Sequence, residues 1–154
     1  MRLDFVKIFI SSTTELLHEL LGPDVEVCSM GMEARPRTGS DVITIISLAG
    51  AAHGRVIFDM DLNTAMNLGR HLIGEEIDGM DGLVSSSIAE LSSMAIGRAI
   101  SQINNNGNHL RMTPPIVIKG SNLESYDKCF ETLVAPLATR YGEVRMNVSV
   151  QDLD

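Results

Sequence analysis

The sequence predicts an α+β fold, a single domain over residues 1–154 in which long helices pack on one face of a largely antiparallel sheet. Three long segments carry apolar residues at helical spacing, shorter segments rich in Val and Ile lie between them, and glycine-containing turns join those short segments closely. A chain of 154 residues can bury roughly 70% of its unfolded surface in one core. No linker or low-complexity segment divides it.

The first half of the chain predicts a helix, three strands and a second helix. Apolar residues at helical spacing indicate a helix over about residues 1–21, which Gly22 and the following proline end. Asp61 is a preferred N-cap residue, so the second helix is expected from there to about Ile73. The strands expected between the helices are residues 25–33, 42–48 and 55–60, and the turns that join them are residues 35–40 and 50–54.

The second half predicts the longest helix, followed by further strands. An acidic, glycine-rich connector over residues 74–82 precedes this helix, and residues 104–108, rich in Asn, end it because Asn and Gly tolerate left-handed backbone. Strands are expected over residues 116–119, 129–138 and 143–151. The connector lacks the ligand order of a calcium-binding loop, and the four histidines have no metal-ligand spacing, so no metal or cofactor of its own is expected.

The central helix has two faces of different character at about 100° per residue. The apolar stripe is Val84, Ile88, Leu91, Ala95, Ala99 and Ile103, and the opposite stripe is Ser86, Glu90, Ser93, Gly97 and Ser101. A solvated helix face normally carries long paired charges, whereas this one is small and smooth around one carboxylate. Either a neighbouring helix of the same chain or a separate partner can lie against such a face, and the pattern alone does not decide between them.

The spacing of Ser86, Glu90 and Pro115 resembles the signature of the CheC/CheX/FliY family of chemotaxis phosphatases. That signature is Asp or Ser, then Glu after three intervening residues, then Asn after two more, then Pro some two dozen residues downstream. This chain departs from it at Ser93, where the family has Asn. The signature occurs once here, and the order of helices and strands is also similar to the CheX-type members.

The resemblance implies a CheY-type response regulator as the partner. In the family the Glu binds the active-site Lys of the regulator, and the Asn orients the water that attacks the aspartyl phosphate. Carried over, the catalytic positions are Glu90 and Ser93, and Ser86, Met94 and Gly97 belong to the binding surface. The resemblance also implies that Mg²⁺ is carried by the regulator, and that the chain forms a homodimer by joining sheet edges.

Two hypotheses of different class follow from the departure at Ser93. In the first, the protein is a phosphatase of phosphorylated regulators in which Ser93 replaces the Asn. In the second, it is a non-catalytic module that docks a response regulator, or a flagellar or signalling partner, through the same helix. A serine hydroxyl can donate and accept hydrogen bonds, but it is shorter than an Asn amide.

Composition excludes several other classes. The formal charge of −8 argues against nucleic acid, which is bound through clustered Lys and Arg, and against an anionic membrane surface. No apolar run approaches the length of a membrane span, and the N-terminal segment lacks the pattern of a signal peptide, so a cytoplasmic protein is expected. Cys28 and Cys129 are predicted to be buried or half-buried thiols.

Overall fold

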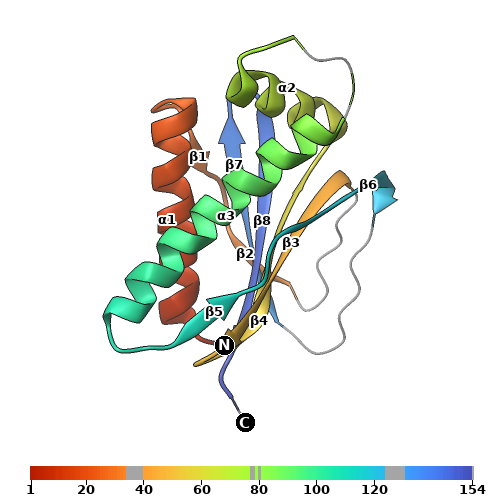
Figure 1. Ribbon diagram of the computed structural model, residues 1–154. Helices are drawn as coiled ribbons and strands as arrows, with labels where there is room; N and C mark the ends of the chain where they lie inside the picture. Colours follow the sequence, from red (N-terminus) through yellow and green to blue (C-terminus); the bar gives the residue numbers. More distant parts are fainter. Residues whose placement is uncertain (34–39, 77–78, 80, 124–130, 154) are drawn as a thin grey trace.

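Three helices lie on one face of an antiparallel sheet in the computed structural model, and the predicted α+β class is confirmed (Figure 1). The structure describes residues 1–33, 40–76, 79, 81–123 and 131–153. The helices are α1 (Leu3–Leu21), α2 (Leu62–Ile73) and α3 (Gly82–Asn105). The strands are β1 (Glu26–Val27), β2 (Gly31–Glu33), β3 (Ser40–Gly50), β4 (His53–Met60), β5 (Leu110–Met112), β6 (Ile116–Leu123), β7 (Thr132–Thr139) and β8 (Gly142–Gln151).

The sheet runs in the order β1-β7-β8-β4-β3-β5, with β2 also paired to β7 and β6 also paired to β3. All of these pairings are antiparallel. The long hairpin of β3 and β4 and the hairpin of β7 and β8 therefore form the centre of the sheet, and α3 crosses diagonally over it beside α1 (Figure 1).

Aspartate side chains fix the starts of α2 and α3. Asp61 accepts a hydrogen bond from the Thr64 backbone N–H at 2.7 Å, as the sequence predicts for an N-cap. Asp81 caps α3 in the same way, since its Oδ1 lies 2.9 Å from the backbone nitrogens of both Leu83 and Val84. The cap at Asp81 fixes where α3 begins.

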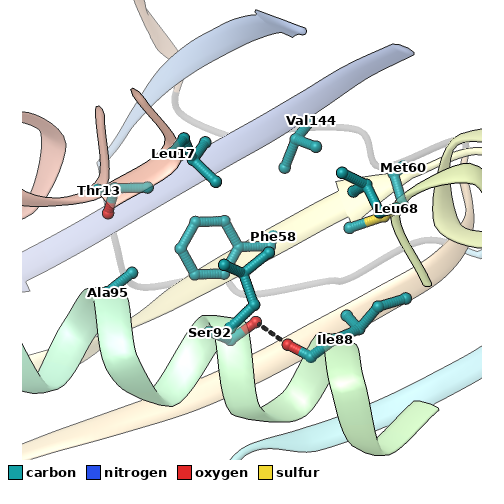
Figure 2. Close-up of a pocket in the computed structure, with 10 residues that line it drawn as sticks. Thr13, Leu17, Phe58, Met60, Leu68, Ile88, Ser92, Ala95 and Val144 are labelled. Carbon is teal, nitrogen blue, oxygen red and sulfur yellow. Dashed lines mark hydrogen bonds between the residues drawn. The ribbon is translucent and has the colours of Figure 1, made fainter. Parts of the chain in front are cut away.

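The main core lies between the helices and the sheet. Its largest fully buried side chains include Phe9, Leu16, Ile46, Leu68, Ile88, Ile96, Ile103, Leu137 and Met146. A cavity of about 20 Å³ lies in this layer beneath α3, where Phe58, Leu68 and Val144 point toward it (Figure 2). Its unpaired polar atom is Thr13 Oγ1, whereas a buried water normally needs two or more partners, so this cavity belongs to the core.

The edge of the sheet differs from the prediction of a single strand over residues 25–33. Two short strands, β1 and β2, pair with β7 instead. Val27 of β1 is paired with Leu137 and Gly31 of β2 with Val134, so this edge contains one more residue than the stretch of β7 opposite it. Pro136 lies in this stretch of β7, and proline has no N–H to donate to a ladder. Cys28 donates its backbone N–H to the Pro136 carbonyl at 2.8 Å and is exposed, so its prediction as a buried or half-buried thiol is wrong.

Other predicted boundaries are corrected more simply. β5 was not predicted, and β6 extends four residues beyond its predicted end at Lys119. β7 begins at Thr132 rather than at the predicted Cys129. Cys129 lies outside the described residues, and so do most of the predicted turn at 35–40 and part of the connector at 74–82. Within the described part of the chain, no helix is long and apolar enough to cross a membrane.

Candidate functional site

The outward side of α3 is open, and every predicted site residue lies on it. Ser86, Glu90 and Met94 are exposed, and Ser93 and Gly97 are half-buried. These five residues span three turns of one helix, and we call their surface the outer face of α3. Among the helices that the structure describes, none covers this face, so packing against a neighbouring helix of the same chain does not explain its small residues.

The inner side of α3 is wider than the predicted apolar stripe. Five members of that stripe are buried, but Leu91 is only half-buried, and two residues outside it, Ser92 and Ile96, are buried. The reason is that α3 contacts α1 and α2 as well as the sheet, so packing covers a broad arc of the helix. Ser92 is accommodated there because its hydroxyl donates to the Ile88 carbonyl at 2.8 Å (Figure 2).

Glu90 stands at the rim of an open hollow where three helices meet. In the described part of the chain, its carboxylate has no hydrogen-bond or ion-pair partner. The hollow is lined by Leu20 of α1, Leu72 of α2, and Ser86, Ser87, Glu90, Leu91 and Met94 of α3. An available carboxylate beside aliphatic walls suits an incoming ammonium group on a long alkyl chain, because the charge can pair while the stem is buried.

A histidine holds the walls of this hollow together. His71 Nε2 lies 2.8 Å from the Leu20 carbonyl, so that nitrogen carries the donated proton. Its Nδ1 lies 2.8 Å from the hydroxyl of Tyr141, and the two rings are 4.8 Å apart. The contact joins the end of α1, α2 and the turn between β7 and β8, which fixes Leu20 of α1 relative to α2.

A second open hollow continues along α3 from Ser93. It is lined by Ser93, Met94, Gly97, Arg98, Ser101, Gln102 and Asn105. A Cβ added to Gly97 would meet nothing within 4 Å, so the glycine leaves this hollow open without serving any contact inside the chain. In the part of the chain that the structure describes, the Ser93 hydroxyl has no hydrogen-bond partner.

Arg98 borders this second hollow and was not among the predicted site residues. Its guanidinium forms two parallel hydrogen bonds to Glu19 of α1, at 2.9 Å and 2.8 Å. The hydrogen bond from Arg98 lowers the pKa of Glu19, and the same bond raises the pKa of Arg98. The two residues are 79 positions apart, so no local pattern could have paired them.

Pro115, the last position of the predicted signature, lies directly before β6 and is half-buried. It precedes a strand that contacts α3. Among the described residues, no three His, Cys, Asp or Glu side chains lie together as the ligands of a metal ion do.

Comparisons with known proteins agree on one family. Residues 42–137, more than half of the chain, match the family model described as chemotaxis phosphatase CheX. The CheY-P phosphatase CheX of Thermotoga maritima is 26% identical over 120 residues, which are 77% of each chain.

Solved structures show the same fold. A CheC-like superfamily protein from Shewanella sp. PV-4 superposes with a TM-score of 0.87 at 20% identity, covering 98% of this chain and 99% of that one. CheX from Borrelia burgdorferi, solved in a CheX–CheY–BeF3–Mg²⁺ complex, gives a TM-score of 0.81 at 26% identity, covering 98% of this chain and 100% of that one. The chain therefore belongs to the CheX family of chemotaxis phosphatases.

Proposed function

We propose that this protein docks a CheY-type response regulator on the outer face of α3 and accelerates hydrolysis of its aspartyl phosphate. The observation that carries the proposal is the available carboxylate of Glu90 on an open, smooth helix face in a member of the CheX family. A relative from Borrelia burgdorferi was solved together with CheY, BeF3 and Mg²⁺, which supports the choice of partner.

The proposed chemistry needs few groups on this chain. Phosphoryl transfer depends chiefly on positioning and electrostatics, and the regulator carries the phosphorylated Asp and the Mg²⁺. Glu90 accepts a charge-assisted hydrogen bond from the active-site Lys of the regulator, which fixes the docked orientation. Ser93, one turn further along α3, holds the attacking water through its hydroxyl, in the position where the resemblance places an Asn. Ser86, Met94 and Gly97 form the surrounding contact surface.

A second candidate is a docking module without turnover, for a response regulator or for a flagellar or signalling partner. The length of the Ser93 side chain favours it. A hydroxyl ends short of where an Asn amide reaches, and it lacks the planar geometry of that amide. If placing the water contributes even about 10²-fold, an imprecise substitute forfeits roughly 2.7 kcal/mol of barrier lowering. Both candidates use the same face and differ only in chemistry.

The deciding experiment follows phosphate loss from a phosphorylated CheY-type regulator of the same genome, with and without this protein. Acceleration above spontaneous decay supports the phosphatase. Glu90→Ala is then expected to weaken regulator binding by about 1.5–3 kcal/mol, roughly ten- to hundredfold, the range for a hydrogen bond to a charged group. Glu26→Ala, which removes an exposed carboxylate on β1, is the matched control and is expected to change neither quantity.

Three outcomes separate the candidates. Acceleration that Glu90→Ala abolishes supports catalysis by a family member that uses Ser93. Decay at the spontaneous rate with binding intact supports the docking module. Unchanged affinity in Glu90→Ala contradicts both, because the partner site would then lie away from the outer face of α3.

We further propose a cytoplasmic homodimer, in which a second copy adds to the sheet at β6. Within the described residues β6 pairs only with β3, and its Ile116 and Ile118 are 60% and 40% exposed. Pairing two β6 strands would cover these side chains. It would also give hydrogen-bond partners to the open N–H and C=O groups of this edge, which proteins otherwise protect from pairing with other chains. The outer face of α3 stays open in such a dimer, because it belongs to the helical layer rather than to the sheet edge.

A further inference from the structure

Arg98 is a charged group at the site whose present partner is exposed to solvent. Its side chain is 43% exposed and that of Glu19 is 56% exposed. A bidentate Arg–carboxylate pair is at the stronger end of surface ion pairs, but water and salt still screen it. The planar guanidinium presents parallel N–H groups, which match a phosphoryl group as well as they match a carboxylate. Arg98 can therefore exchange Glu19 for another anion that accepts the same two parallel hydrogen bonds.

The hollow beside Arg98 has the chemistry of an anion site. Apart from Arg98, its described lining residues are uncharged, and Ser93 and Ser101 contribute hydroxyls while Gln102 and Asn105 contribute amides. Each of these groups can donate a hydrogen bond. Glu19 pairs with the guanidinium and the charge of Glu15 also acts on it, so the carboxylates that neutralise Arg98 come from α1 and the lining of the hollow adds none.

Arg98 approaches the hollow from a flank of the outer face of α3. Side chains on an α-helix lean toward its N-terminus, so a long side chain covers the turn before its own Cα. Arg98 follows Ser93 by five residues, about 7.5 Å along the helix axis and about 140° around it, so the guanidinium borders the hollow from the side of α1 rather than from above Ser93. Both residues line one hollow, and Gly97 leaves the space between them unfilled.

We infer that Arg98 is a further substrate-binding residue, which releases Glu19 and binds the phosphoryl oxygens of the docked regulator. This inference rests on the proposed function. Arg98 supplies a planar donor on the hollow that Ser93 also lines, and positive charge where negative charge gathers on the phosphoryl group. Glu19 has two effects. It orients the guanidinium of Arg98 before the regulator docks, and it competes with the phosphoryl group for that guanidinium after docking. The two members of the ion pair therefore act on binding in opposite directions.

The test compares regulator binding by wild type, Arg98→Gln and Glu19→Gln. The regulator is used unphosphorylated and in its beryllofluoride-activated form, and affinities are measured by isothermal titration calorimetry. Arg98→Gln is expected to weaken binding of the activated form about tenfold or more and to change binding of the unphosphorylated form little. Glu19→Gln is expected to strengthen binding of the activated form, because it removes the internal competitor.

A matched control comes from another exposed ion pair, between Arg140 and Asp24, 3.6 Å apart. Arg140→Gln loses a similar surface contact away from the outer face of α3 and is expected to leave both affinities unchanged. Thermal unfolding of all three variants checks that each is folded to the same extent as wild type.

Three results would overturn the inference. Affinity changes of the same sign in Arg98→Gln and Glu19→Gln would mean that the pair acts only as a structural contact. Equal weakening of both regulator forms by Arg98→Gln would mean that Arg98 contacts an acidic surface of the partner rather than the phosphoryl group. Absence of binding by wild type to either form would overturn the proposed function as well, which distinguishes the two failures.

Discussion

Two glycines inside helices, Gly69 of α2 and Gly97 of α3, are present for different reasons. Glycine in a helix interior costs roughly 0.5–1 kcal/mol relative to alanine, so each position requires an explanation. A Cβ at Gly69 would lie 2.7 Å from Cγ1 of the buried Val84, which shows that α2 and α3 approach each other too closely for a side chain. A Cβ at Gly97 would meet nothing within 4 Å.

The neighbouring serines of α3 show the same contrast. Ser92, on the inner side, is 4% exposed and its hydroxyl is hydrogen-bonded to the Ile88 carbonyl. Ser93, on the outer face, is half-buried and its hydroxyl has no partner among the described residues. On the inner side small residues allow the helices to pack closely. On the outer face the fold makes no use of them, and this supports the proposal that an external partner does.

The largest effect is expected from Ser93→Asn, which tests whether the outer face still has the geometry for catalysis. An amide at this position should orient the attacking water and raise the rate of regulator dephosphorylation by about 10²-fold, or roughly 2.7 kcal/mol of barrier. Stability should change little, because the side chain is not enclosed by the core. The measurement is phosphate release at saturating concentrations of this protein.

Ser11→Asn is the control for this gain. Ser11 is exposed on α1 and lines neither of the two hollows of α3, so an amide there is expected to leave the rate unchanged. A variant Ser93→Asn that binds the regulator normally but shows no gain would contradict the prediction, and would mean that the docked regulator does not present its phosphoryl group at Ser93.

The contrast between the two sides of α3 also shows how far the sequence could be interpreted. The outer face was predictable because helical periodicity is a local property of the chain. The division of the edge strand into β1 and β2 depends on Pro136 in a strand more than 100 residues later. The pairing of Arg98 with Glu19 likewise joins two helices that only the tertiary fold brings together.

Gly69→Ala tests the inner side of the comparison. The new methyl group would press against Val84, a buried and β-branched side chain with little freedom to move. Overpacking of this kind costs about 1–3 kcal/mol, which exceeds the gain in helix propensity. Urea denaturation should show a lower midpoint with an unchanged m-value. A variant as stable as wild type would show that α2 can move away from α3, and that Gly69 is not required by their packing.

Gly97→Ala tests the outer face and is expected to act in the opposite direction on stability. Beyond its own stretch of α3, the methyl group meets no described atom within 4 Å, so the free energy of unfolding should rise by about 0.5–1 kcal/mol through helix propensity alone. The same methyl group stands in the hollow between Ser93 and Arg98, so affinity for the activated regulator should fall. Denaturation and regulator titration on one preparation measure both quantities. A variant that is more stable and binds as well as wild type would show that the glycine serves neither the fold nor the partner. A gain in stability together with a loss of binding is the result expected of a surface shaped for an external partner.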